Sequence, residues 1–272
     1  MTTFLFWNVP QKGVEGIITS VVHAHVVDVL ILAECVIPAG SMLLALNATT
    51  KRQFHLTKSG KCRRVTIYSR LPRTHVTSLE EHSDDKLTLR RLVLSRTEVL
   101  LAAVHLSSRR YYENPDKDSE LRILGRAIRN AEEIVGHTRT VLLGDLNANP
   151  FDDGVVVADG LHGVMSRRIA SKGFRKVASK TYPFFYNPMW GHFGESTGGP
   201  SGTYYRAGST FEELFWHMWD QVLLRRDLLE FFKDEDLKVL ASDGGKSLLK
   251  RTGIPSKSVA SDHLPILFRL DL

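Results

Sequence analysis

Polar and ionisable side chains gather at the ends of short apolar runs in this sequence. They are Asn8, Glu34, His105, Asp145, Asn147, Asp220, Asp262 and His263. Each one alone is most simply explained as a turn former, a helix cap or a hydrogen-bonded core histidine. Together they are harder to explain in this way, because converging carboxylates repel one another and are costly to bury without a cation or a hydrogen-bond donor. A hard divalent cation held by carboxylate and amide oxygens would compensate that cost, so the set indicates metal-assisted chemistry.

Apolar runs that alternate with amphipathic stretches must position these side chains. The runs predict strands at Phe4–Val9, Asp28–Glu34, Thr88–Leu94, Val99–Leu106, Val141–Asp145, His217–Leu224 and Leu264–Leu270, and hairpin-linked strands within Phe54–Arg70. Apolar residues at helical spacing predict helices at Val14–Val26, Pro38–Ala48, Ser119–Val135 and Arg225–Asp234. Strands and hairpins mixed with helices favour an α/β fold, a four-layered α/β/β/α sandwich in which two mixed β-sheets pack face to face, flanked by helices.

The length of 272 residues fits one domain with a sizeable core, as in many large two-sheet α/β enzymes. We therefore expect residues 1–272 to form a single domain. The region from about 147 to 215 has no clear hydrophobic period and is too long for an ordinary connection. We expect it to form a long active-site loop region.

The charge and the hydropathy of the chain limit its classes of partner. A formal net charge of +6 and a pI near 9.3 favour polyanionic partners, although many basic proteins bind no nucleic acid. No apolar stretch reaches the roughly 18 residues of a membrane span, so we expect no stable membrane association. The first predicted strand begins at Phe4, which leaves no room for a secretion signal, and we expect a cytoplasmic protein. Nothing in the sequence requires an oligomer, and we expect a monomer.

Six short strings, in chain order, resemble the endonuclease/exonuclease/phosphatase superfamily, which includes deoxyribonucleases, abasic-site endonucleases, sphingomyelinases and inositol-polyphosphate phosphatases. They are WNV (7–9), LAE (32–34), VHLS (104–107), GDLNANP (144–150), WDQV (219–222) and SDHLPI (261–266). The most specific are GD-x-N and SDH-x-P. The resemblance implies the two-sheet fold and metal-dependent hydrolysis of phosphate esters. Abasic-site enzymes carry an acidic residue shortly after the first Asn, and its absence after Asn8 disfavours that subfamily.

The resemblance also implies roles for the matched positions. Asn8, Glu34 and Asp262 would bind or orient the metal ion. His263 would contact the scissile phosphate, with Asp220 fixing its ring, because a His paired with an Asp is held in one tautomer and its cationic form is stabilised. Oxygen ligands make Mg²⁺ the first choice of cofactor and Mn²⁺ the second. The two cysteines lie far apart in the sequence and make zinc a poor choice.

The remaining matched positions concern the attacking water and the phosphate. Asp145 and Asn147 would position or deprotonate the water, since a carboxylate of suitable pKa can act as a general base. His105 matches the deoxyribonuclease-like members, in which a histidine after a strand contacts the phosphate. Tyr68 is a candidate for the tyrosine that those members place on a neighbouring strand, and a tyrosine of the core or sheet surface explains it equally well.

Basic and aromatic residues bear on which phosphate ester is the substrate. Arg109 and Arg110 follow His105, and further basic residues flank the hairpin turn between 58 and 64. These residues would track a phosphate backbone, or simply form a solvated face. Aromatic residues of the long region, Tyr186 and Trp190 among them, would stack unpaired bases, close over a small substrate, or pack the loop onto the sheet.

These observations favour a nuclease that cleaves DNA or RNA by metal-assisted attack of water on the phosphate. The alternative is a phosphatase or phosphodiesterase that acts on a lipid, an inositol phosphate or a nucleotide. A catalytically inert binding module is a third hypothesis, disfavoured because all the principal site residues are present. The fold by itself does not select among substrates.

Overall fold

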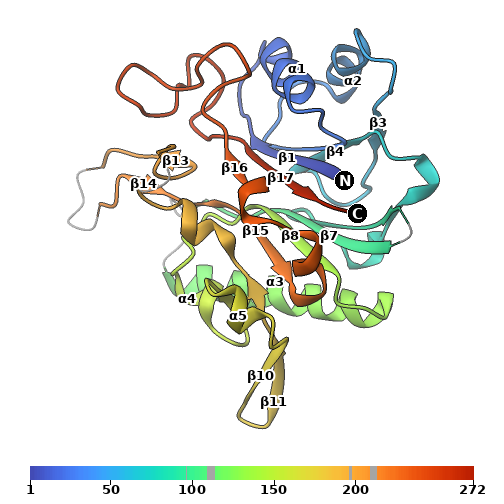
Figure 1. The fold of residues 1–272 in the computed structure, drawn as a ribbon, viewed down its shortest axis with the longest axis vertical. Helices are drawn as coiled ribbons and strands as arrows, with labels where there is room; N and C mark the ends of the chain where they lie inside the picture. Colours follow the sequence, from blue (N-terminus) through green and yellow to red (C-terminus); the bar gives the residue numbers. More distant parts are fainter. Residues whose placement is uncertain (96, 109–113, 196–197, 209–212) are drawn as a thin grey trace.

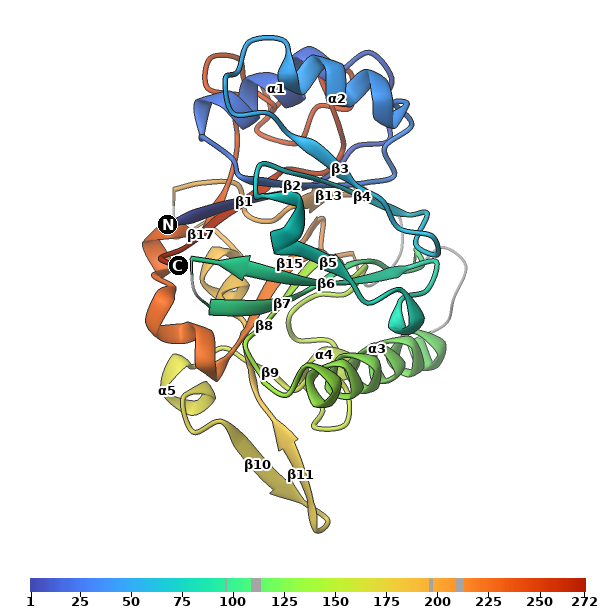
Figure 2. The same ribbon diagram turned by 90° about the vertical axis from the view of Figure 1, so that its right-hand side faces the viewer.

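The computed structural model describes residues 1–95, 97–108, 114–195, 198–208 and 213–272 (Figure 1). Two β-sheets lie face to face in the middle of the molecule, and helices cover their outer faces. Figure 2 shows the layers in order, with α1 and α2 on one side of the two sheets and α3 on the other. This arrangement confirms the predicted four-layered α/β/β/α sandwich.

The first sheet has six strands in the order β16-β17-β1-β2-β4-β3. In that order, their bounds are Lys238–Val239, Ile266–Leu270, Thr2–Asn8, Val29–Ala33, Val65–Ser69 and His55–Thr57. β1 pairs parallel to β2 and antiparallel to β17, so the two ends of the described chain meet in the centre of this sheet. The sheet is mixed, as predicted.

The second sheet has seven strands in the order β5-β6-β7-β8-β15-β12-β9. In that order, their bounds are Val76–Ser78, Leu87–Leu94, Thr97–His105, Thr140–Asp145, Asp220–Arg225, Phe185–Tyr186 and Gly163–Val164. β7 and β8 are parallel, as are β12 and β9, whereas the other pairs are antiparallel. This second sheet is therefore also mixed.

Side chains that alternate along each strand build two different cores. On β1, Phe4 and Phe6 point between the sheets, where they join apolar residues of β2, β7 and β8. Leu5 and Trp7 point to the outer face, where they pack with α1 (Glu15–Ala24) and α2 (Ala39–Asn47). The outer face of the second sheet packs in the same way against α3 (Asn114–Val135). Both faces of each sheet are thus buried, which explains why the strands read as continuous apolar runs.

The region from 147 to 215 contains more regular structure than its sequence pattern indicates. It supplies β9 and β12 to the second sheet, the short helices α4 (Asp153–Val156), α5 (Arg167–Ala170) and η4 (Pro188–His192), and the strand β13 (Tyr204–Tyr205), which pairs with β14 (Trp216–His217) directly after the region. The hairpin of β10 (Phe174–Val177) and β11 (Lys180–Pro183) projects away from the body (Figure 2). Each of these elements has at most five residues, too few for a hydrophobic period to show.

The predicted helix at Arg225–Asp234 differs from the structure. Arg225 is the last residue of β15, and its buried guanidinium pairs with Glu132 of α3, with Nε 2.8 Å from Oε1. The chain then continues as the 3₁₀ helices η5 (Arg226–Phe231) and η6 (Asp234–Asp236). Further 3₁₀ turns, η1 (Arg73–His75) and η2 (Glu80–His82), flank β5.

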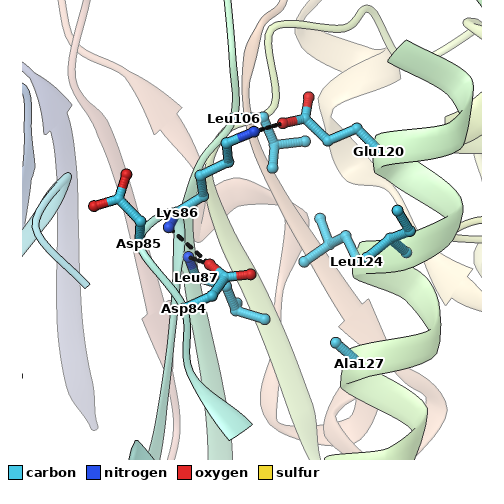
Figure 3. Close-up of a pocket in the computed structure, with 9 residues that line it drawn as sticks. Asp84, Asp85, Lys86, Leu87, Leu106, Glu120, Leu124 and Ala127 are labelled. Atoms are coloured by element: carbon cyan, nitrogen blue, oxygen red, sulfur yellow. Dashed lines mark hydrogen bonds and ion pairs between the residues drawn. The ribbon is translucent and has the colours of Figure 1, made fainter. Parts of the chain in front are cut away.

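An ion pair ties the start of α3 to the second sheet. Lys86, just before β6, reaches Glu120 across a groove of about 320 Å³, with Nζ 2.6 Å from Oε1 (Figure 3). The other Glu120 oxygen lies 2.9 Å from Nζ of the buried Lys117. Lys117 in turn donates to the Ser107 carbonyl at 3.1 Å. This network fixes the chain directly after His105, at the end of β7.

A glycine allows β7 and β8 to approach closely beside the polar strand ends. A Cβ built on Gly144 would overlap the carbonyl oxygen of Val104, and the φ of Gly144 is +154°. We predict that Gly144→Ala lowers the free energy of unfolding by about 3 kcal/mol or more, because backbone cannot yield as a side chain can.

Urea unfolding followed by circular dichroism measures this loss. Gly16→Ala in α1 is the matched control, because a Cβ there meets nothing within 4 Å. That control should be neutral or stabilising by up to about 1 kcal/mol. Equal stability of the two variants would contradict the close approach at Gly144.

Candidate active site

The pairing register places the polar strand-end residues in one row. Asn8 ends β1, and Glu34 follows the parallel neighbour β2. In the second sheet, His105 lies opposite Asp145, and Asp220 lies opposite Asp145 from the other side. β1 and β8 contact each other across the two sheets. The ends of both sheets therefore meet at Asn8 and Asp145.

A cleft of about 270 Å³ opens at this junction. It is lined by Asn8, Pro10, Glu34, Ser108, Asp145, Asn147, Tyr204, Trp219, Lys257, Asp262 and His263. Asp220 lies directly behind His263 and is fully buried, and His105 contacts the cleft through Glu34. The structure thus brings together all eight of the polar strand-end residues.

His263 is fixed by several hydrogen bonds. Its ring nitrogen Nδ1 lies 2.8 Å from Asp220 Oδ2. The Ser261 hydroxyl accepts from the His263 N–H at 3.0 Å and donates to the carbonyl of Asn8 at 2.6 Å. The indole of Trp7 donates to the His263 carbonyl at 2.9 Å. The loop before β17 is therefore bound to the end of β1.

Charge determines where the proton of this pair lies. Burial alone would lower the pKa of His263, but the Asp220 carboxylate and its hydrogen bond raise that pKa to about 9. Burial raises the pKa of Asp220. We place the proton on His263, because Asp145 and Asp262 add further negative charge around the ring. With Nδ1 bound to Asp220, Nε2 remains to face the cleft.

Asn8 connects the two sheets at the cleft. Its Nδ2 donates to Asp145 Oδ2 at 2.9 Å and to Glu34 Oε1 at 3.4 Å. His105 Nε2 lies 3.0 Å from the same Glu34 oxygen and 3.7 Å from Asp145 Oδ2. The hydrogen bond from His105 lowers the pKa of Glu34 to about 2, although burial opposes this shift. Glu34 is therefore ionised at neutral pH.

The oxygen atoms at this position fit a hard divalent cation. Asn8 Oδ1 is buried and has no hydrogen-bond partner among the residues that the structure describes. The Glu34 carboxylate beside it is partly exposed, and Asp262 lines the same cleft, 3.4 Å from Lys257 Nζ. An orphaned amide oxygen in a cleft that also holds two carboxylates is a ligand set that Mg²⁺ or Mn²⁺ accepts.

A second group of possible ligands is less suitable. One donor atom each of Asp145, Asp220 and His263 lies within 4.8 Å of the others, so this group could hold a metal ion. A His263 ring that carries a proton on each nitrogen has no lone pair for a metal, however. We therefore favour the side of the cleft formed by Asn8 and Glu34.

Two site residues adopt the left-handed backbone conformation, Glu34 with φ 52° and Asn147 with φ 48°. Asn tolerates this conformation, whereas a Glu there costs of order 1 kcal/mol. Asn147 is held because its N–H donates to Asp145 Oδ1 at 2.8 Å and its Nδ2 to the Leu106 carbonyl at 3.1 Å. The N–H of Glu34 donates to the Arg64 carbonyl at 3.3 Å. These bonds aim both side chains at the cleft.

Two predicted substrate-binding tyrosines lie elsewhere. Tyr68 packs in the outer core of the first sheet, and its hydroxyl donates to the Ala39 carbonyl of α2 at 3.4 Å. Tyr186 pairs with Leu224 near the end of β15, whereas Asp220 lies at the start of that strand. The Tyr186 hydroxyl donates to Asp234 at 2.7 Å. Both rings are buried in apolar cores and neither lines the cleft, so the structure does not bring them together with the other predicted site residues.

Of the other predicted substrate-binding residues, the structure describes Trp190 alone. The Trp190 ring packs near Phe151, with centroids 6.1 Å apart, and the Phe193 ring lies 5.9 Å from the same Phe151 ring. Trp190 does not line the cleft. Arg109 and Arg110 lie outside the described residues.

Five residues of the cleft have no individual role in the sequence-based prediction: Pro10, Ser108, Tyr204, Trp219 and Lys257. Tyr204 stacks on Trp219 with centroids 4.3 Å apart, and its ring lies 4.6 Å from that of His263. Trp219 directly precedes Asp220, a signal that the WDQV string contains, and Tyr204 belongs to the aromatic long region. No sequence signal singles out Lys257.

A family model supports the resemblance of the strings. The model described as "Endonuclease/Exonuclease/phosphatase family" matches residues 6–263, nearly the whole chain. The chain belongs to this family. Its members are hydrolases that act on phosphoesters. No curated protein matches the sequence.

Solved structures share the fold of this family member at low sequence identity. An AP endonuclease from Archaeoglobus fulgidus aligns with TM-score 0.60 and 15% identity, covering 100% of both chains. The 3'-5' exonuclease NExo from Neisseria meningitidis aligns with TM-score 0.56 and 19% identity, also over 100% of both chains. D. rerio TDP2 in complex with a single-stranded DNA product aligns with TM-score 0.58 and 16% identity, covering 98% of this chain and 97% of TDP2. No helix in the described part of this chain is long and apolar enough to cross a membrane.

The Asp220–His263 pair makes a testable pH prediction. In Asp220→Asn, the His263 pKa should fall well below about 9, because burial then acts without the largest opposing charge and only Asp145 and Asp262 still raise the pKa. A titration of the His263 ring by ¹⁵N NMR measures this pKa. Asp271→Asn, an exposed carboxylate at the end of the chain, is the matched control. A His263 pKa that stays near 9 in Asp220→Asn would show that Asp220 does not cause the raised pKa.

The same pair predicts how stability depends on pH. A pKa raised in the folded state stabilises the protein fully below the unfolded value of about 6.5, and this contribution is lost as pH rises through 9. The free energy of unfolding of the wild type should therefore fall between pH 6.5 and 9 relative to that of Asp220→Asn. If the free energy of unfolding had the same pH dependence in both proteins, the ionisation of His263 would not contribute to stability as predicted.

Proposed function

We propose that this protein is a metal-dependent nuclease that hydrolyses phosphodiester bonds of nucleic acid. The observation that carries the proposal is the buried Asp220–His263 pair, which presents a protonated imidazole to the cleft beside Asp145. A net charge of +6 supports a polyanionic substrate. The names of the structural neighbours, an AP endonuclease, a 3'-5' exonuclease and a complex with a DNA product, support the same substrate class.

His263 would bind the scissile phosphate. Its Nε2 would donate a hydrogen bond to a phosphoryl oxygen and stabilise the negative charge that develops there. The raised pKa keeps the ring cationic across neutral pH. His105 would contact the same phosphate through Nε2, which now faces Glu34.

Asp145 would orient the attacking water and take its proton. Its Oδ1 accepts from the Asn147 N–H and its Oδ2 from the Asn8 amide, so the plane of the carboxylate is fixed. As the water oxygen bonds to phosphorus, its proton would move to Asp145 and the bond to the leaving oxygen would break. Asn147 would hold the turn that aims Asp145.

Asn8, Glu34 and Asp262 would hold Mg²⁺, with Mn²⁺ as a substitute. All three line the cleft and carry side-chain oxygen atoms. When bound, the cation would polarise the phosphate and neutralise part of its charge. The depressed pKa of Glu34 means that this ligand needs no deprotonation at neutral pH.

The proposal is tested with four substrates in parallel: single-stranded DNA, double-stranded DNA, RNA and bis-p-nitrophenyl phosphate, each with Mg²⁺, Mn²⁺ or a chelator. Asp145→Asn and His263→Ala should each lower turnover by about 10²–10⁴-fold, because each removes a group that acts in the transition state. Circular dichroism should show an intact fold. Asp271→Asn is the control and should behave as the wild type.

The outcomes separate the hypotheses. Cleavage of a polymer that needs metal and His263 supports the nuclease. Cleavage of the small diester alone would favour a small-molecule phosphodiesterase. Silence on all four substrates would favour a phosphomonoester or lipid substrate, or an inert module. A near-normal rate in His263→Ala would overturn the proposed site.

The metal site is tested separately from activity. Glu34→Gln should weaken Mn²⁺ binding, measured by electron paramagnetic resonance, by about tenfold or more, because a charged oxygen ligand is replaced by a neutral amide. Asp271→Asn again serves as the control for loss of one carboxylate. Unchanged Mn²⁺ affinity in Glu34→Gln would remove Glu34 from the metal site.

A further inference from the structure

A second hollow shares a wall with the candidate active site. It has a volume of about 300 Å³ and is lined by Glu34, Cys35, Arg63, Arg64, Thr66 and His105. Glu34 also lines the cleft in which we place the scissile phosphate, and His105 contacts Glu34 at 3.0 Å. A substrate that extends from the cleft past Glu34 would therefore enter this hollow.

The two arginines give the hollow a positive side. Arg63 is exposed and has no ion-pair partner among the described residues. Arg64 uses its Nε to bind Asp85 Oδ2 at 3.1 Å, which leaves its two terminal nitrogens available. The Arg64 carbonyl accepts from the N–H of Glu34, so this arginine is joined directly to the site. Asp85 orients Arg64, and its carboxylate is half exposed and offsets only one of the two guanidinium charges.

Hydrogen bonds to Glu80 hold the loop that carries Arg63 and Arg64 in place. Glu80 Oε2 accepts from the Ser59 hydroxyl at 3.2 Å and from the N–H groups of Gly60 and Lys61 at 3.0 and 3.3 Å. The fully buried Arg90 binds the other oxygen of Glu80 at 3.0 Å. A loop organised in this way loses little entropy when its arginines bind a ligand.

The far end of the loop is fixed as well. The N–H groups of Arg63 and Arg64 donate to the Asp85 carbonyl at 3.3 and 3.4 Å, and the Cys62 thiol donates to the same carbonyl at 3.3 Å. Cys62 itself is buried in the core between the sheets. The two arginine side chains therefore start from a rigid backbone next to Glu34.

We propose that Arg63 and Arg64 form a phosphate-binding subsite that takes the phosphate next to the scissile one. Planar guanidinium groups bind phosphate oxygens in pairs, and they remain charged at every relevant pH. The inference rests on the proposed function, because it assumes that the scissile phosphate lies beside Glu34 and His263. It narrows the substrate class to molecules with at least two phosphates in sequence, such as a nucleic-acid strand.

The first test of the subsite measures binding of an oligonucleotide under conditions that prevent turnover. Fluorescence anisotropy with a labelled single-stranded oligonucleotide, in chelator, would compare the wild type, Arg63→Ala and Arg226→Ala. Arg226 is also exposed, but it follows the end of β15 opposite to Asp220 and is the matched control. Arg63→Ala should weaken binding about tenfold and lower the slope of log K against log salt by about one, whereas the control should bind as the wild type.

Turnover then shows which phosphate the subsite binds. A trinucleotide has two phosphodiesters and a dinucleotide has one. Arg63→Ala should raise KM for the trinucleotide about tenfold, with little change in kcat, and leave cleavage of the dinucleotide and of bis-p-nitrophenyl phosphate unchanged. Dinucleotides with a 5' or a 3' terminal phosphate would show on which side of the scissile bond the subsite lies. Arg63→Lys, which keeps the charge, should recover part of the affinity.

The two readouts distinguish failure of the subsite from failure of the proposed function. If the wild type cleaves the oligonucleotide and Arg63→Ala matches the control in both assays, the subsite is overturned and the nuclease stands. If binding depends on Arg63 but no substrate is cleaved, the subsite stands and the nuclease fails. Equal losses on the trinucleotide and the small diester would show a structural effect of Arg63 and would also overturn the subsite.

Discussion

Asp145 and Asp220 lie opposite each other on β8 and β15 with exposures of 1% and 0%. Two buried carboxylates on neighbouring strands repel each other and lose hydration, so each needs a partner. Asp220 takes the proton-bearing ring of His263, and Asp145 takes the amide of Asn8 and the N–H of Asn147. These partners come from β1, from the turn after β8 and from the loop before β17. The hydrogen bonds that stabilise these two carboxylates therefore join segments from both ends and from the middle of the described chain.

This constraint also explains why the sequence indicates the candidate site. A carboxylate or amide that ends a run of buried residues is unusual, and Asn8, Asp145 and Asp262 stand in such places within strings typical of one superfamily. The apolar runs themselves predict the long strands, because both faces of each sheet are buried and the strands are uniformly apolar. The same uniformity hides which face a residue points to. Tyr68 follows Ile67 along β4. Ile67 points between the two sheets and Tyr68 points to the outer face of the first sheet, and this difference is known only once the position of the second sheet is known.

Short elements limit the prediction in another way. β9 and β12 have two residues each, and they are strands because the edge of the second sheet offers them partners. No local pattern of two residues can indicate that. Tyr186 was expected to meet substrate because it lies in an aromatic stretch, yet β12 carries it to the end of β15 that is remote from Asp220. Tyr204 reaches the cleft instead, through pairing with His263 that joins residues far apart in the chain.

The distribution of charge in the cleft has a consequence for binding. The protein as a whole carries a formal charge of +6, yet its cleft contains Glu34, Asp145 and Asp262, with Asp220 behind them. Protonated His263 and Lys257 offset only part of this negative charge. A phosphate would bind such a site more weakly without a cation that neutralises the carboxylates, and a cation binds best where the carboxylates are not already paired. Metal and phosphate should therefore favour each other's binding, because each supplies the charge that the other lacks. The orphaned oxygen of Asn8 is consistent with this view, since it has no hydrogen-bond partner among the described residues and belongs to the amide whose nitrogen binds Glu34 and Asp145.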